Sequence, residues 1–186
     1  MTNYRLGYAC INMTLGAQKP KVTTNRSMIK RTFKEKGIAY ASELALQNVK
    51  DLRQILEWNL QNDITFFRMS SDIFPWASEY ALEDLPDFNE IEEILFECGL
   101  FAEEHGMRLT THPGPFNKLC SPNEQVVLNT IRDLEIHGKL MDLLCQPRTP
   151  KPKSTFTLEV HTMINLWPLA IFAGTTLDYQ TLYGLD

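Results

Sequence analysis

The sequence predicts an α/β fold made of parallel βα units. Three short runs of strand-forming residues, at 5–12, 64–69 and 107–111, alternate with three longer segments of helical periodicity. Strands and helices that alternate in this order pair in parallel and are joined by right-handed crossovers. A barrel of eight such units needs about 250 residues. We therefore expect a barrel-like arrangement of parallel βα units that is truncated after about three to four units.

The first unit begins with residues 5–12, which are rich in strand-forming side chains. A polar loop that contains Gly16 and Pro20 follows this strand. Ser42 is then expected to cap a helix that ends at Asn62. The apolar residues of this helix share one face at helical spacing: Leu44, Val49, Leu52, Ile55, Leu56 and Leu60.

The second unit begins with the compact apolar run 64–69, which has the length of a strand and is followed by polar residues. A proline-punctuated stretch at 75–86 separates this strand from the next helix. Gly106 is expected to end that helix, because glycine readily takes the left-handed conformation found after helices. The helix is indicated by apolar residues at helical spacing: Ile91, Ile94, Leu95, Cys98, Phe101 and Ala102.

The third unit begins with a strand at 107–111, and a loop must start at His112. The residues that follow, Pro113, Gly114 and Pro115, prevent any regular continuation of the strand. Ser121 is expected to cap the third helix, with proline at the first helical position. The apolar residues of this helix are Val126, Val127, Leu134, Leu140, Met141 and Leu144.

The composition is that of a single soluble domain. The chain has 186 residues, of which 44% are hydrophobic, and this suffices for one core of ordinary size. It has no apolar run of about 20 residues and no leader-like segment after residues 1–5, so we expect an intracellular protein in the cytoplasm or nucleus, without membrane contact. The cysteines form no CxxC pair and are expected to be reduced and mostly buried: Cys10, Cys98, Cys120 and Cys145.

The charge is unevenly distributed along the chain. The formal net charge is −5, which does not by itself indicate a nucleic-acid-binding protein. Residues 19–36 hold seven Lys or Arg against Glu35, a local balance of +6 in a segment with loop character. This segment either contacts a phosphate backbone or is an ordinary solvated loop. Residues 79–104 carry ten acids and no Lys or Arg, as expected for the solvated face of a helix.

The last part of the sequence differs in composition from the rest. Residues 154–186 contain no Lys or Arg. We divide the chain into residues 1–150, the barrel-like part, and a divergent tail at 151–186. One hypothesis is a shifted reading frame, because codons permitted for Lys153 to Val160 also spell Ile-Asn-Ile-His-Ile-Gly-Gly, which has the pattern of another barrel strand. A genuine divergent C-terminus and a truncated gene product are the alternatives.

Four motifs in order along the chain resemble the UV damage endonuclease family. They are RLGYACINMTLG at 5–16, TTNR at 23–26, FFRMSSDIFPWASEY at 66–80 and RLTTHPGPFNKLCSP at 108–122. The likeness extends to about residue 150, and the tail departs from it. The resemblance implies a TIM barrel with a cluster of divalent metal ions, commonly manganese, at the C-terminal ends of its strands. It also implies a DNA repair endonuclease that nicks UV-damaged double-stranded DNA on the 5′ side of photoproducts. No obligate protein partner is evident from the sequence.

The resemblance makes His112 and Glu79 the candidate metal ligands. The histidine of the family's HPG motif binds metal, and His112 follows a predicted strand, where barrel active sites gather. Glu79 stands where many relatives have a histidine ligand after the WAS segment. A carboxylate also suits a hard divalent ion, although Glu79 could equally be a surface acid. The other ligands of the family lie on later strands that this chain lacks, and His105 and His137 are expected to be structural.

The resemblance also gives candidate residues for binding DNA and the lesion. Extruding a poorly stacked photoproduct costs less than extruding a normal base, and an aromatic side chain can fill the gap. Phe116 stands where the family places such a probe, while Pro115 replaces the glutamine that partners it in much of the family. The remaining candidates are Tyr8 and Asn12, which face the lesion or the metal site in the family, and Thr24, Asn25 and Arg26 as phosphate contacts.

Two further functions remain open on the sequence alone. Because most of the family's ligands are absent, the chain could be a non-catalytic or vestigial DNA-binding fragment, whose exposed strand edges would promote association. A sugar-isomerase-like enzyme on the same barrel plan is the other alternative, since fold does not fix function. The HPGPF and TTNR motifs argue against the isomerase.

Overall fold

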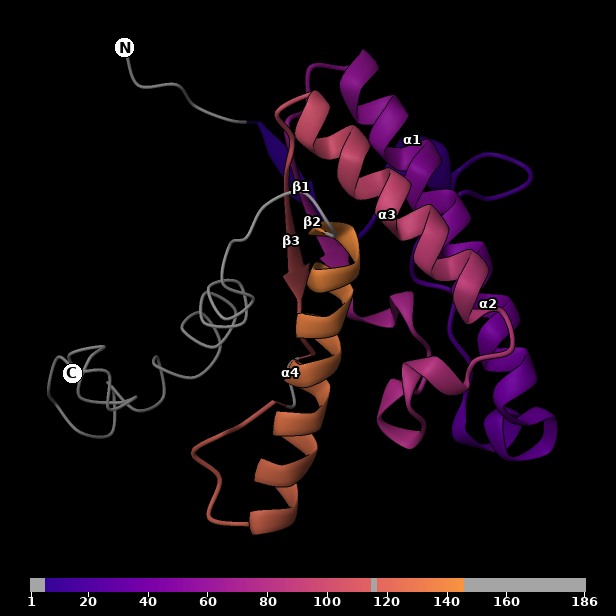
Figure 1. Cartoon of the computed structure of the whole chain (residues 1–186), viewed down its shortest axis with the longest axis vertical. Coiled ribbons are helices and arrows are strands. Elements are labelled where there is room, and N and C mark those ends of the chain that lie inside the picture. The colour runs from indigo at the N-terminus through magenta and orange to yellow at the C-terminus, as the bar shows by residue number, and fades with distance from the viewer. Residues whose placement is uncertain (1–5, 115–116, 146–186) are drawn as a thin grey trace, which may run out of the picture.

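The structure is a computed structural model that describes residues 6–114 and 117–145. It has an α/β fold with a three-stranded parallel sheet in the order β1-β2-β3. The strands are β1 (Gly7–Ala9), β2 (Phe66–Ser70) and β3 (Arg108–His112). The helices α2 (Lys30–Gln61), α3 (Phe88–Glu104) and α4 (Glu124–Cys145) lie on one face of this sheet (Figure 1). The predicted α/β class and its three strand and helix pairs are confirmed.

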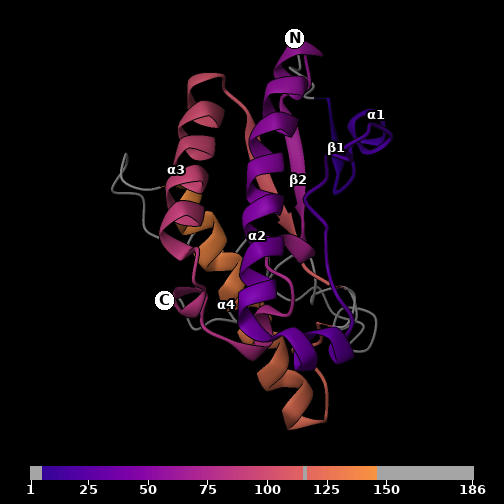
Figure 2. The same ribbon diagram turned by 90° about the vertical axis from the view of Figure 1, so that its right-hand side faces the viewer.

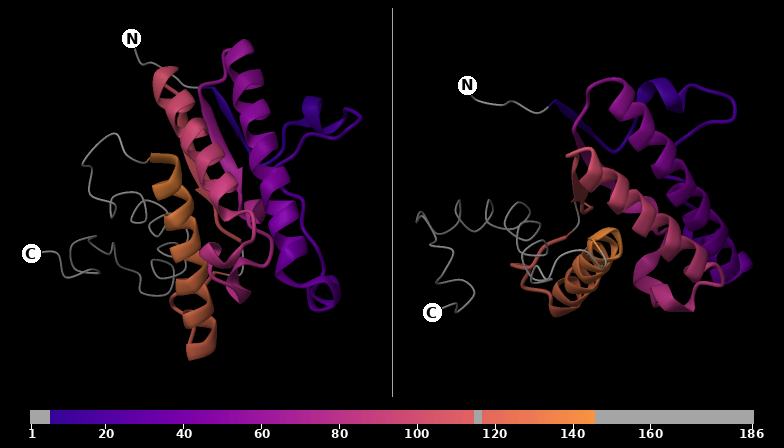
Figure 3. Two further views of the ribbon diagram at one scale, coloured as in Figure 1. Left: turned by 45° about the vertical axis from the view of Figure 1, so that its right-hand side comes forward. Right: turned by 45° about the horizontal axis from the view of Figure 1, so that its top comes forward.

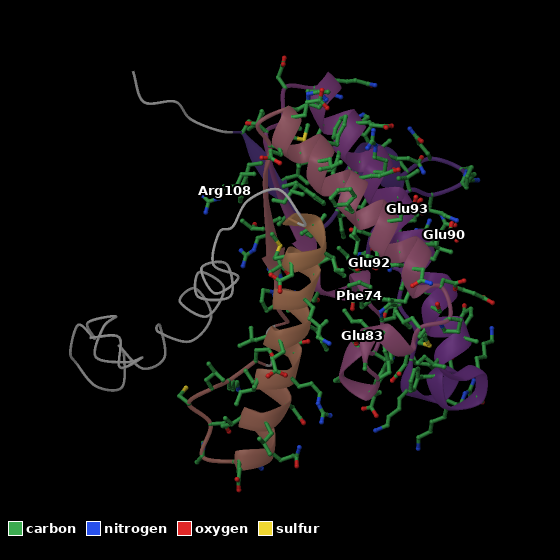
Figure 4. The ribbon with its side chains drawn as sticks, viewed as in Figure 1. Phe74, Glu83, Glu90, Glu92, Glu93 and Arg108 are labelled. Atoms are coloured by element: carbon green, nitrogen blue, oxygen red, sulfur yellow. The ribbon has the colours of Figure 1, made fainter. Side chains whose placement is uncertain are left out.

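The strands alternate between a face that packs on the helices and a face that does not. Phe67 pairs in register with Tyr8 and Leu109, and Met69 pairs with Thr111. Phe67 and Met69 are buried in the core. Helices α2 and α3 cover the sheet in Figure 2. On the opposite face Arg108 points away from all three helices (Figure 4). We call this second surface the open face of the sheet.

Helix α2 begins earlier than the sequence suggested. It starts at Lys30, and residues 30–36, which were expected to be part of a basic loop, are helical. Gly37 has a φ of 68° inside the helix and bends it there, a conformation that glycine accepts at little cost. Ser42 therefore lies within the helix and does not cap it. Its hydroxyl instead donates to Asp87 Oδ2 at 2.7 Å and accepts from the Asp87 N–H at 3.0 Å, which joins α2 to the start of α3.

Short helical turns occupy two segments that were expected to be irregular. The loop after β1 contains α1 (Met13–Gly16), because Asn12 caps it by accepting a hydrogen bond from the Leu15 N–H at 2.9 Å. Three 3-10 turns follow β2, at Ser71–Ile73, Ala77–Glu79 and Leu82–Asp84. These turns place Ile73, Phe74, Leu82 and Leu85 in the core.

Helices α3 and α4 approach each other closely. A Cβ atom at Gly99 would come within 1.4 Å of the Leu144 carbonyl oxygen, so only glycine fits at this contact. The expected end of α3 is confirmed, since Gly106 follows the helix with a φ of 61°. The start of α4 was expected at Ser121, but the helix begins at Glu124. Asn123 takes the capping role, because its side chain accepts from the Gln125 N–H at 3.0 Å.

Helix α4 runs antiparallel to β3 and extends well beyond its carboxyl end (Figures 1 and 3). Of the cysteines, Cys98 is buried, Cys10 is half-buried and Cys120 is exposed, so the expectation of mostly buried thiols is wrong for Cys120. No helix in the described part of the chain is long and apolar enough to cross a membrane. The boundary at residue 150 and the tail at 151–186 lie outside the described residues.

Candidate functional site

The candidate residues gather at the carboxyl edge of the sheet, where the three parallel strands end. Ligands of parallel α/β sheets bind at this edge, in the loops that follow the strands. Asn12 lies three residues after the end of β1, the turns that carry Glu79 follow β2, and His112 is the last residue of β3. The structure therefore brings the segments that carry these three candidates to one end of the sheet.

His112 lies on the open face of the sheet. It pairs in register with Ser70 of β2, and its imidazole is half-buried. Its side chain forms no hydrogen bond with any described residue. This placement agrees with the predicted strand end and differs from that of His105, which contacts the Phe101 ring at the end of α3.

Glu79 is exposed in the turn Ala77–Glu79. Its N–H donates to the Trp76 carbonyl at 2.9 Å, and Trp76 has a left-handed backbone with a φ of 59°. No hydrogen bond links Glu79 to His112 among the described residues. The described ranges also contain no group of three or more His, Cys, Asp or Glu side chains placed to hold a metal ion. His112 and Glu79 alone therefore do not fit a complete metal centre.

Tyr8 and Asn12 form a hydrogen-bonded chain that reaches into α2. The Tyr8 hydroxyl donates to Asn59 Oδ1 at 2.8 Å and accepts from Asn12 Nδ2 at 2.8 Å. Burial raises the pKa of Tyr8, which keeps its hydroxyl protonated as a donor. Tyr8 lies on the helix-packed face, beside Phe67 at 5.0 Å between ring centroids. The contact of these two residues with a lesion stays a prediction.

The TTNR loop at residues 23–26 is held against α2 by a partly buried ion pair. Arg26 Nη1 lies 2.7 Å from Asp51 Oδ2, and the Asp51 carboxylate also accepts from the Thr23 N–H at 2.7 Å. Arg26 donates further to the carbonyls of Lys21 and Thr23. The charge of Arg26 is therefore compensated within the chain. Its predicted contact with phosphate stays a prediction, as do those of its neighbours Thr24 and Asn25.

Thr24 is completely buried, and its hydroxyl has no partner among the described residues. Asn25 is half-buried, and its side-chain oxygen accepts from the Thr23 hydroxyl. The loop thus turns most of its polar groups inward. Pro115 and Phe116, the proposed probe pair, lie outside the described residues.

Asn48 joins the TTNR loop to the segment after β2. Its Oδ1 accepts from the Arg26 N–H at 3.0 Å, and its Nδ2 donates to the Arg26 carbonyl and the Asp72 carbonyl, both at 3.0 Å. Sequence reasoning missed Asn48 and Asp51. The available signal was a pair of polar residues on the apolar side of α2, since both are buried beside Ala45 and Leu52.

A second link joins the same two segments through aromatic rings. Trp76 Nε1 donates to the Met28 carbonyl at 2.6 Å. The Phe33 ring stacks against both Trp76 and Tyr80, with ring centroids 6.1 Å and 6.2 Å away. The turn that carries Glu79 is therefore anchored to the start of α2 by residues on either side of it.

Helix α4 contributes a buried histidine close to His112. His137 is 4% exposed, and its Nδ1 shares a hydrogen bond with the Thr111 hydroxyl. Burial lowers the pKa of His137, the nearby Asp133 raises it in part, and His112 lowers it further. Burial also raises the pKa of Asp72, and the Asp133 charge adds to this. The expected structural role of His137 fits these contacts, but its position beside the candidate site was not foreseen.

Comparisons with known proteins agree with the motifs. A family model described as UV-endonuclease UvdE matches residues 4–161. The chain is 39% identical over 137 residues to the UV-damage endonuclease of Schizosaccharomyces pombe, and this match covers 74% of the chain and 22% of that relative. It is 38% identical over 141 residues to a putative UV-damage endonuclease of Acanthamoeba polyphaga mimivirus, covering 75% of the chain and 42% of the relative.

The fold is also similar to a solved structure. A crystal structure described as that of SacUVDE superposes with a TM-score of 0.64 at 31% sequence identity, and the match covers 76% of this chain and 46% of that one. The chain thus spans less than half of the length of each of these three proteins.

Proposed function

Because this chain belongs to the UV-endonuclease UvdE family, we propose that it acts in DNA repair as the N-terminal part of an endonuclease for UV-damaged DNA. The cut would fall on the 5′ side of a photoproduct in double-stranded DNA. The observation that carries the proposal is the family match over residues 4–161. Within this range the segments that follow β1, β2 and β3 lie at the same edge of the sheet.

The proposal includes the TIM-barrel architecture for the complete enzyme. Two features support it: the strand order β1-β2-β3 follows the chain order, and α2, α3 and α4 cover one face. A doubly wound sheet would have helices on both faces and a reversal in strand order. In a barrel the open face of this sheet, with Arg68 and Arg108, would line the interior.

The proposal also includes dependence on divalent metal ions, with manganese as the first candidate. Such ions would activate water and stabilise the leaving oxygen in phosphodiester hydrolysis. His112 and Glu79 would supply two ligands of the kinds that manganese accepts. Since they do not form a centre by themselves, the remaining ligands would come from outside the described residues.

DNA contacts would be shared between two kinds of residue on this chain. Exposed Lys19, Lys21, Lys30 and Lys34 have no ion-pair partner among the described residues, so they are better placed than Arg26 to neutralise phosphates. Tyr8 and Asn12, together with Pro115 and Phe116, would approach the lesion. The acidic surface of α3, labelled in Figure 4 at Glu90, Glu92 and Glu93, would face away from the DNA.

A nicking assay tests this proposal directly. The substrate is an end-labelled duplex with one UV photoproduct, incubated with the full chain and manganese, and the control is the undamaged duplex. Cleavage 5′ of the lesion that chelation abolishes supports the endonuclease. Selective binding of the damaged duplex without cleavage supports the second candidate, a non-catalytic DNA-binding fragment, which the incomplete ligand set of residues 6–114 and 117–145 favours. Equal behaviour toward damaged and undamaged DNA contradicts both.

A further inference from the structure

Three polar residues follow one another on a single face of α4. Thr130, Asp133 and His137 are spaced by three and four residues, so they project on the same side of the helix. Thr130 is 1% exposed and His137 is 4% exposed. Buried polar groups are costly unless they form hydrogen bonds, so such a row calls for partners. We call these three residues the polar stripe of α4.

The stripe binds the chain on both sides of the HPG motif. His137 Nδ1 shares a hydrogen bond with the Thr111 hydroxyl, one residue before His112. Asp133 Oδ2 accepts from Asn117 Nδ2, and Thr130 Oγ1 accepts from the Lys118 N–H at 2.9 Å. All three bonds join residues that lie 12 to 26 positions apart in the sequence. One helix face therefore fixes both the end of β3 and residues 117–118.

The members of the stripe are also held in place themselves. The Thr130 hydroxyl donates to the Val126 carbonyl at 2.8 Å, which leaves its oxygen directed at Lys118. His137 Nε2 lies 3.7 Å from Asp133 Oδ2, which places the ring beside the carboxylate that binds Asn117. Thr111 is buried on the helix-packed face, and its carbonyl accepts from Arg68 Nε at 3.3 Å. The bonds thus form a connected network from β2 through β3 to α4.

A neighbouring side of α4 reaches the turn that carries the second candidate ligand. Arg132 Nη1 donates to the Ser78 carbonyl at 3.1 Å, and Ser78 directly precedes Glu79. Lys139 Nζ lies 2.9 Å from Glu83 Oε1. Both contacts are exposed and contribute less than the buried stripe. They nevertheless connect the same helix to the segment after β2, which carries Glu79.

We propose that the polar stripe of α4 positions the HPG motif, and that Asp133 and His137 are positioning residues for His112. His137 holds the strand at Thr111, while Asp133 and Thr130 hold the chain where it returns at Asn117 and Lys118. His112, Pro113 and Gly114 lie between these anchors. The effect of the stripe on turnover rests on the proposed endonuclease function, whereas its effect on the placement of residues 111–114 and 117–118 does not.

Amide hydrogen exchange on the full chain tests the positioning role without any activity. Thr130→Val keeps the side-chain volume but removes the acceptor for the Lys118 N–H. We expect exchange at Lys118 to accelerate by about three- to tenfold, the range set by loss of one hydrogen bond, while amides in α2 keep their protection. Unchanged exchange at Lys118, or an equal acceleration in α2, would refute the positioning role.

Variants at Asp133 separate positioning from general packing. Asp133→Ala removes the acceptor for Asn117, whereas Asp133→Asn keeps an oxygen in the same place. We expect faster exchange over residues 117–118 in the alanine variant and near wild-type exchange in the asparagine variant. Glu135→Ala removes an exposed carboxylate from the same helix and serves as the matched control. If the asparagine variant behaves like the alanine variant, or if Glu135→Ala has the same effect, the stripe does not position this segment.

Kinetics supply a second measurement when nicking is detectable. We expect Asp133→Ala to lower kcat by about tenfold while KM stays within about twofold, because misplacement of His112 affects the reaction more than DNA binding. Asp133→Asn should restore kcat. A rise in KM alone would contradict the positioning role. If the wild-type chain does not nick DNA, the proposed endonuclease function fails. The hydrogen-exchange results still decide whether the polar stripe positions the HPG motif.

Discussion

Asn48 exchanges two hydrogen bonds with the backbone of Arg26, accepting from its N–H and donating to its carbonyl, both at 3.0 Å. The same side-chain nitrogen also donates to the Asp72 carbonyl at 3.0 Å. A single buried amide in α2 thus holds the TTNR loop next to the segment that follows β2.

Substitution of Asn48 by alanine should be strongly destabilising. It would remove the partner of the Arg26 N–H and of the Arg26, Asp72 and Ile73 carbonyls, and we expect a loss of about 2–4 kcal/mol in the free energy of unfolding. Urea unfolding followed by circular dichroism measures this. Asn129→Ala, at an exposed position of α4, is the control and should cost less than about 0.5 kcal/mol. Equal effects of the two substitutions would show that Asn48 does not join these segments.

Substitutions of Arg26 and Asp51 should have strongly coupled effects on the free energy of unfolding. Asp51 is 2% exposed and Arg26 is 24% exposed, so removal of one partner leaves a poorly solvated charge. We expect Asp51→Ala to cost about 2–3 kcal/mol, discounted from a fully buried pair because Arg26 is partly solvated. In a double-mutant cycle with Arg26→Ala, the coupling energy should exceed about 1 kcal/mol. Additive effects would mean that Arg26 is free for other partners, including phosphate.

The buried His137 should make stability depend on pH in a defined direction. Burial holds its pKa below the ordinary value of 6.5, so the unfolded state binds more protons between the two pKa values. The contribution of neutral His137 to the free energy of unfolding is therefore fully present above pH 6.5. It is lost as the pH falls through this value toward the lower pKa of the folded state.

The measurement is urea unfolding of the wild type and His137→Gln at about pH 5.5 and about pH 7.5. The wild type should lose more stability on acidification than the variant, because only the wild type must protonate a buried imidazole. Identical losses in the two proteins would mean that His137 titrates in the folded state as it does in the unfolded state.

The contact of α3 with α4 requires glycine at position 99. A methyl group there would meet the Leu144 carbonyl oxygen at 1.4 Å, and we expect Gly99→Ala to cost about 3 kcal/mol or more by forcing the helices apart. Gly16→Ala is the matched control, because the nearest atom to its Cβ is Lys21 Cε at 4.0 Å. It should change the melting temperature little. A melting temperature unaffected by Gly99→Ala would contradict the observed packing.

Strands and helices could be predicted from the sequence where residues close in the chain determine them. The end of β3 could be predicted from the prolines that follow His112. The end of α3 could be predicted from glycine at position 106, which has a positive φ in the structure. Helix starts were less predictable. Ser42 has the right chemistry for a cap, but α2 continues through Gly37 to an earlier start, and the Ser42 hydroxyl bonds to Asp87 instead.

The candidate site was predictable only in part, because much of it depends on tertiary contacts. The strand order brings the segments that carry Asn12, Glu79 and His112 to one edge, as parallel units require. The residues that support these segments, Asn48 and Asp133, have partners that lie far away in the sequence, and no local pattern names such partners. A polar residue on the buried side of a helix was the one signal that pointed to Asn48.

A chimera in which this chain replaces part of a relative tests both the endonuclease function and the role of His112. Residues 6–145 would substitute for the matching segment of the Schizosaccharomyces pombe UV-damage endonuclease, and nicking of a duplex with one photoproduct would be measured with manganese. We expect this chimera to cut 5′ of the lesion, and we expect His112→Ala in the chimera to abolish cutting. A folded chimera that does not cut, or one in which His112→Ala cuts as fast as the parent, would contradict these expectations.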